Sequence, residues 1–147
     1  MRAPWGMRGY TLIELLAVLT LFAIGASAFA PTARRLADLA AVSAAREELV
    51  AILGEARVVA MMAGESTVIV VARPPSVRIE SRGASIRSLG LGGGRPISLD
   101  LGRGRDSVSM TFNGLGLGRF ANQTIEFGRG GASASVVISS YGRVRRR

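Results

Sequence analysis

Near its N-terminus the sequence contains an apolar stretch that runs from Tyr10 to Ala30. Glu14 is the only charged residue among these 21 positions. At about 1.5 Å per residue, a helix of this length reaches roughly 30 Å, the thickness of the hydrocarbon core of a bilayer. The stretch therefore predicts one membrane-spanning helix at residues 10–30, behind a short basic leader at residues 1–9.

The carboxylate of Glu14 is costly in such a helix. A charge inside the membrane costs roughly 2.5–3.5 kcal/mol on insertion scales, so we expect it to have a partner. Cleavage between Gly9 and Tyr10 would create an α-amino group one helical turn from Glu14, whereas a carboxylate that only snorkels to the interface is the simpler alternative. An ordinary secretory signal would instead be cut after the apolar region, where Ala26-Ser27-Ala28 offers a site.

The residues around this boundary resemble a known motif. Gly9-Tyr10-Thr11-Leu12-Ile13-Glu14-Leu15-Leu16 is similar to the prepilin cleavage motif of type IV pilins and type II secretion pseudopilins, although the family most often has Phe at the position of Tyr10. The resemblance implies that a prepilin peptidase/methyltransferase cleaves after Gly9 and N-methylates Tyr10. It also implies assembly with other pilins or pseudopilins, with Glu14 paired to the amino group of Tyr10 in an adjacent subunit.

Composition excludes several classes of chemistry. The 147-residue chain has no Cys and no His, which rules out disulfides, Cys/His metal sites and catalysis by Ser-His or Cys-His pairs. No pair of carboxylates suggests acid–base work, because Asp100 and Asp106 lie near Arg103 and Arg105 and are expected to be neutralised there. We therefore expect no enzyme, no catalytic residue, no metal and no cofactor.

The net charge is +9, and every basic residue is Arg. Such a balance favours acidic partners, namely nucleic acid, anionic lipid or acidic protein surfaces. An Arg-rich genomic composition explains the overall charge equally well, and it accounts for the absence of Lys better than any function does.

Residues 31–64 continue the helix in amphipathic form. Pro31 is expected to kink the helix rather than to end it, and Gly64 is expected to end it. The apolar stripe follows a spacing of three, four or seven residues and consists of Leu36, Leu39, Val42, Leu49, Leu53, Ala56 and Ala60.

Residues 65–147 change to a period of two with frequent Gly, which is typical of short strands joined by turns. The expected strands are Thr67–Ala72, Val77–Glu80, Ser85–Leu89, Ile97–Leu101, Ser107–Phe112, Thr124–Phe127, Ser135–Ser139 and Tyr141–Arg145. The predicted fold is therefore α+β and pilin-like: a long N-terminal helix, with its first half in the membrane and its second half packed on an antiparallel β-sheet.

A second resemblance covers this region. Gly64-Glu65-Ser66-Thr67-Val68, Thr111-Phe112-Asn113-Gly114 and Gly142-Arg143-Val144-Arg145 are similar to segments of the GspH/FimT pseudopilin domain, although Gly114-Leu115-Gly116 fits that family loosely. The resemblance implies a GspH-like domain at residues 65–147. Residues 73–106 match no family segment.

The chain ends in Arg143, Arg145, Arg146 and Arg147. On a strand, Arg143 and Arg145 would point to one face and Val144 to the other, and each guanidinium could bind a phosphate. A C-terminal Gly-Arg-x-Arg motif is associated with DNA binding in FimT-type pilins of DNA-uptake systems. A solvated basic tail is the simpler alternative.

Together these patterns predict a minor pseudopilin of a type II secretion system that resembles the H-type subunit. The alternative is a FimT-like minor type IV pilin that binds DNA for uptake. Arg2 and Arg8 predict a cytoplasmic leader, so the chain is expected to be single-pass in the inner membrane with a periplasmic or extracytoplasmic C-terminal domain.

Overall fold

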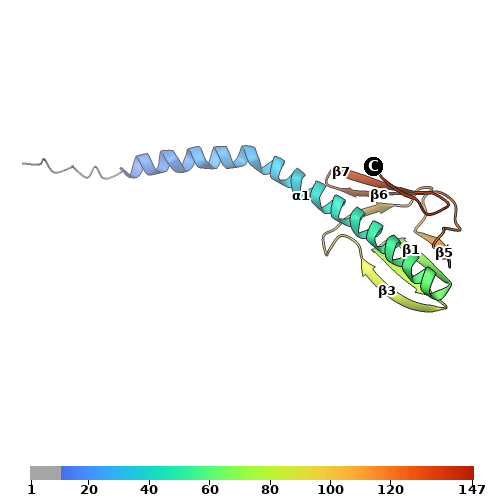
Figure 1. Cartoon of the computed structure of the whole chain (residues 1–147). Coiled ribbons are helices and arrows are strands. Elements are labelled where there is room, and N and C mark those ends of the chain that lie inside the picture. The colour runs from blue at the N-terminus through green and yellow to red at the C-terminus, as the bar shows by residue number, and fades with distance from the viewer. Residues whose placement is uncertain (1–10) are drawn as a thin grey trace, which may run out of the picture. The chain divides into compact units, whose positions relative to one another are not determined.

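The computed structural model describes residues 11–147 and contains one helix and eight strands (Figure 1). Gly9 and Tyr10, the expected cleavage and methylation sites, lie outside the described residues. The chain divides into two compact units between Arg34 and Arg35. The elements are α1 (Leu12–Ala63), β1 (Glu65–Ala72), β2 (Pro75–Ser81), β3 (Ala84–Gly90), β4 (Ser98–Asp100), β5 (Ser107–Asn113), β6 (Gln123–Arg129), β7 (Ala132–Ile138) and β8 (Val144–Arg146).

The first unit is the N-terminal part of α1. Thr11 caps this helix, because its Oγ1 accepts a hydrogen bond of 3.2 Å from the backbone N–H of Glu14. Thr11-Leu12-Ile13-Glu14 has the spacing of a capping box, with Glu14 in the first turn. The helix contains an 18-residue stretch with a mean hydropathy of 2.2 in which no residue is buried, so it meets the length and composition of a membrane span.

Helix α1 runs without a break through Pro31, as the sequence predicts, and ends at Ala63. Gly64 follows with φ of 94°, a left-handed conformation that terminates helices and that glycine adopts without strain. The Nε of Arg82 donates a 3.0 Å hydrogen bond to the carbonyl of Ala63. This bond satisfies one of the carbonyls that a helix leaves unpaired at its C-terminal end.

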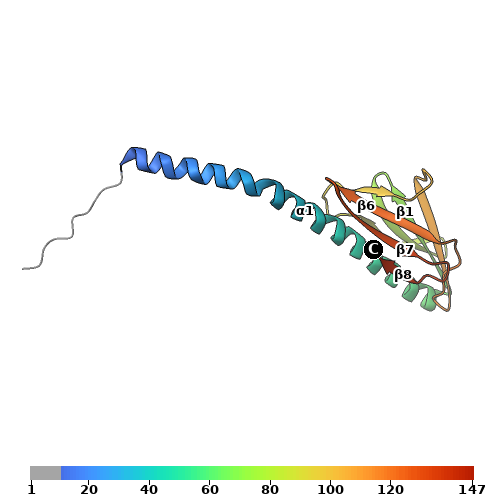
Figure 2. The same cartoon turned by 90° about the horizontal axis from the view of Figure 1, so that it is seen from above.

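In the second unit, residues 35–63 of α1 pack on two antiparallel sheets (Figures 1 and 2). The strand orders are β3-β2-β1-β5 and β4-β6-β7-β8. Each of the eight strands overlaps a segment that the sequence predicts, and the antiparallel pairing is confirmed. The sequence suggested one sheet where the structure has two, because an alternating pattern shows which side of a strand is buried but not which strands are neighbours.

The core lies between the helix and the inner faces of both sheets. Its largest fully buried side chains include Phe112, Phe127, Leu49, Leu53 and Ile79. Most of the predicted helical stripe is buried, from Val42 to Ala60.

Two residues of that stripe are exceptions. Leu36 is 62% exposed and Leu39 is 40% exposed, so the prediction that the apolar stripe of the second half of the helix packs on the sheet is wrong for these two residues. The buried face of α1 begins only at Ala41. The period of the sequence identifies the apolar face of a helix, but it does not say where along the helix the covering sheet begins.

Candidate functional site

Glu14 lies exposed in the first turn of α1, and it makes no ion pair with any residue from 11 to 147. Its expected partner, the amino group of Tyr10, falls outside the described residues. The helix N-terminus carries a partial positive charge, which favours a carboxylate in this turn. Glu14 therefore has a local role in the helix besides the one expected in assembly.

The four C-terminal arginines do not form one cluster. Strand β8 pairs with β7 in a register that places Arg145 beside Val137 and Arg146 beside Val136. Successive side chains of a strand point to opposite faces. Val136 is fully buried under α1, so Arg146 lies on the side of the helix, whereas Arg145 lies on the outer side.

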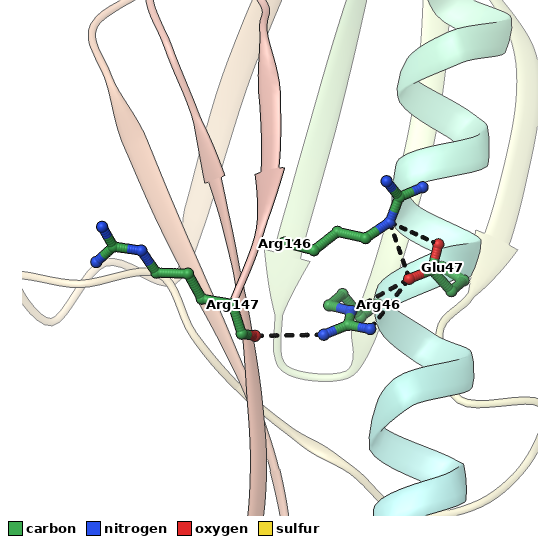
Figure 3. A network of polar contacts seen from close by, with 4 residues as sticks. All are labelled: Arg46, Glu47, Arg146 and Arg147. Atoms are coloured by element: carbon green, nitrogen blue, oxygen red, sulfur yellow. Dashed lines mark hydrogen bonds and ion pairs between the residues drawn. The ribbon is translucent and has the colours of Figure 1, made fainter.

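Arg146 is bound to the helix through Glu47 (Figure 3). Its Nε lies 3.0 Å from both carboxylate oxygens of Glu47. The Nη2 of Arg46 lies 3.1 Å from the same carboxylate, and its Nη1 donates to the backbone oxygen of Arg147. The hydrogen bond from Arg146 is the main reason that the pKa of Glu47 lies below its usual value. The end of the chain is thus fixed to α1 by one carboxylate and two guanidinium groups.

Arg143 and Arg145 are different. Both are exposed, and within residues 11–147 neither forms an ion pair. They line the same shallow hollow of about 630 Å³, together with Asn122, Val137, Ser139 and Tyr141. This hollow therefore holds two unneutralised guanidinium groups, which suits an anionic ligand.

Gly142 places these arginines by a close backbone approach. Its φ is 82°, and a Cβ at this position would lie 2.8 Å from Nη2 of Arg57 and 2.8 Å from Cε1 of Phe112. The backbone of residue 142 therefore lies directly on these two side chains, and only glycine fits there.

Arg57 is a functional candidate that the sequence reasoning missed. It lies over the ring of Phe112, 5.5 Å from the centroid, and its buried Nε has no hydrogen-bond partner in the described part of the chain. It lines a second hollow of about 540 Å³, beside Arg143 and Tyr141, whose other lining residues are Val50, Leu53, Gly54 and Val144. One weak signal for Arg57 is present in the sequence, namely an Arg beside the apolar stripe of α1.

The expected neutralisation around Asp100 and Asp106 is wrong. Arg105 instead donates to the carbonyl of Leu101 at 2.6 Å and to Oε1 of Gln123 at 2.9 Å. No ion pair joins these aspartates to Arg103 or Arg105 in the structure of residues 11–147. Arg105 therefore organises its own loop through backbone and amide oxygens.

Comparisons with known proteins bear on the N-terminal motif and on the fold. Residues 6–30 match the model of the prokaryotic N-terminal methylation motif. The crystal structure of the type IV minor pilin FimU from Pseudomonas aeruginosa PAO1 superposes with a TM-score of 0.58, at 18% identity, over 72% of this chain and 87% of that chain. The chain carries a prepilin motif and has a pilin-like fold. No curated protein sequence matches this pilin-like chain significantly.

Proposed function

We propose that the pilin-like chain is a minor, non-enzymatic subunit of a type II secretion pseudopilus assembled from the inner membrane. The observation that supports this proposal is α1 itself. Its first part exposes apolar side chains over a length that would span a bilayer, and the same helix continues into the core of a pilin-like unit. A helix that is apolar all round needs lipid or other helices to cover it. The membrane would provide lipid before assembly, and the filament would provide neighbouring helices after it.

A low copy number follows from charge. Loss of Arg2 and Arg8 with the leader would reduce the net side-chain charge from +9 to +7. Identical subunits with this charge would repel one another in a continuous filament. Incorporation of single copies among less basic subunits avoids this repulsion, so the charge supports a minor rather than a major subunit.

Processing and assembly can be tested together. Intact-mass analysis of the protein extracted from membranes should give a chain that begins at Tyr10 and carries one methyl group. Because the chain has no Cys, a single Cys at Leu16 should form disulfide cross-links only with a Cys placed in a neighbouring subunit. A start at Met1 or Phe29, or no cross-link to any co-expressed pseudopilin, would contradict the proposal.

The second candidate function is DNA binding by a FimT-like minor type IV pilin. The observation that favours it is the pair Arg143 and Arg145, which share one hollow without a carboxylate partner among the described residues. Because Arg146 is already paired with Glu47, Arg143 and Arg145 are the stronger candidates for contacts with phosphate. Two such contacts predict weak, salt-sensitive binding without sequence preference.

A salt titration tests this function. Replacement of Arg143 and Arg145 by Gln should reduce the log–log salt slope of DNA binding by about two units, since each neutralised phosphate releases counterions. The matched control is Gln at Arg73 and Arg95, which are exposed arginines without an ion pair in residues 11–147. Equal losses in both double variants would mean that net charge alone is responsible. Absence of binding at about 20 mM salt would leave secretion as the function.

A further inference from the structure

Tyr141 has the most exposed aromatic side chain of the second unit. It is 74% exposed, yet its backbone is held in place. Its carbonyl accepts a hydrogen bond of 3.2 Å from the N–H of Gly118, and the next residue, Gly142, donates one of 2.7 Å to the carbonyl of Ser139. A ring on a fixed backbone loses little conformational freedom on contact with a ligand.

Cationic hollows lie at this ring. Tyr141 and Arg143 line both of them. One hollow adds Arg57, whose buried Nε is unpartnered among residues 11–147 and whose Cζ lies 5.5 Å from the centroid of the Phe112 ring. The other adds Arg145 and the polar side chains of Asn122 and Ser139. An aromatic ring between guanidinium groups is the arrangement by which proteins bind a base together with its flanking phosphates.

We propose that Tyr141 is a stacking platform for an unpaired nucleobase, so that this site prefers single-stranded to double-stranded DNA. The inference rests on the proposed DNA-binding function and specifies the form of the nucleic acid. The base would stack on the Tyr141 ring. One flanking phosphate would contact Arg57 and Arg143, and the other would contact Arg143 and Arg145.

The preference follows from which surfaces of the nucleic acid are free. In a duplex, both faces of each base are covered by neighbouring bases, so Tyr141 could stack only at an end or after unstacking. The phosphates of a duplex would still reach the exposed Arg143 and Arg145. Single-stranded DNA offers phosphates and open base faces together, and stacking on an aromatic ring tolerates every base.

The test uses the full chain in a nonionic detergent, with fluorescein-labelled oligothymidine and a mixed-sequence duplex of equal length, at about 20 mM salt. Tyr141→Ala should weaken binding of oligothymidine by roughly 5- to 150-fold, the equivalent of 1–3 kcal/mol. It should change binding of the duplex by less than about twofold, because the phosphate contacts remain. Tyr141→Phe keeps the stacking ring and should bind oligothymidine like the wild type.

Fluorescence gives a second readout of stacking. The chain has two tyrosines, Tyr10 and Tyr141, and one tryptophan, Trp5. In a Trp5→Phe background, oligothymidine should quench tyrosine emission, and Tyr141→Phe should abolish the quenching while it preserves affinity.

The possible outcomes separate the two proposals. The inference is overturned if duplex and single strand bind the wild type equally and Tyr141→Ala changes the affinity for neither. It is also overturned if Tyr141→Ala weakens binding of both to the same degree. In either case Tyr141 is no stacking platform, while DNA binding stands. If neither nucleic acid binds to the wild type, both the inference and the DNA-binding function fail.

Discussion

The Nε of Arg146 lies 3.0 Å from both carboxylate oxygens of Glu47, and this pair joins the last strand of the chain to its only described helix. A charged strand at the edge of a sheet is thereby bound to the core helix by a side-chain contact across 99 residues of sequence. The same contact removes Arg146 from the set of arginines that could bind a ligand.

Glu47→Gln should therefore loosen β8, because the strand loses its contact with α1. It should also release the guanidinium groups of Arg46 and Arg146, and if the chain binds DNA, these free charges should strengthen its salt-sensitive binding. Filter binding at two salt concentrations measures this gain in DNA binding. The charge-matched control is Glu65→Gln, at an exposed carboxylate without an ion pair in residues 11–147; an equal gain in this control would show that only net charge changed.

The contribution of Glu47 to stability should depend on pH. Its pKa is lower in the folded chain than the usual 4.5, chiefly because Arg146 donates a hydrogen bond to the carboxylate. A lowered pKa means that the pair stabilises the fold fully above about pH 4.5 and that this contribution disappears as the pH falls through the lower folded value. Urea unfolding of wild type and Glu47→Gln should thus differ near pH 7 and converge in acid, whereas a constant difference would contradict the assignment.

Two variants distinguish the local capping role of Glu14 from its expected role in the salt bridge between subunits. Glu14→Val should remain in the membrane, because the helix becomes more apolar, but it should fail to assemble because the partner amine is left unpaired. Glu14→Gln keeps a residue that suits the third position of a capping box and loses only the charge. If Glu14→Gln assembles normally in a co-purification assay with neighbouring subunits, the local capping role is sufficient and the salt bridge between subunits is wrong.

Leu53 tests the packing of α1 on the sheets. The side chain is 1% exposed and belongs to the core, so Leu53→Ala should cost about 2–5 kcal/mol in the free energy of unfolding. Chemical denaturation of a fragment that begins at Arg35 measures this cost. Leu36→Ala in the same fragment is the control, since Leu36 is mostly exposed, and it should cost less than about 0.5 kcal/mol.

Gly142 tests the placement of the C-terminal arginines. Gly142→Ala puts a methyl group against Arg57 and Phe112 at a positive φ, so we expect a loss of about 1–3 kcal/mol in stability. Gly131→Ala is the matched control, because its φ is also positive but its Cβ would meet nothing within 4 Å. A difference between the two variants in thermal unfolding measures the close approach alone, and equal losses would show that backbone strain accounts for the whole effect.

The features that depend on neighbouring residues in the chain can be predicted from the sequence. The length of the apolar run predicts a membrane-compatible helix, and the spacing of Leu49, Leu53 and Ala56 predicts its buried face. Short apolar or alternating runs between Gly turns predict segments that overlap each of the eight strands. The prepilin motif around Glu14 is likewise local, and the match of the methylation model at residues 6–30 supports it.

Which residues far apart in the chain meet depends on the packing of the folded protein. Alternation along β8 places Arg145 and Arg146 on opposite faces, but the contact of Arg146 with Glu47 depends on how β8 packs beside α1. The position of Arg57 beneath Gly142 and the exposure of Leu39 depend in the same way on where the sheets cover the helix. Local patterns fix faces and periods, whereas the pairing of distant elements is set by the packing of the whole core, which no short segment encodes.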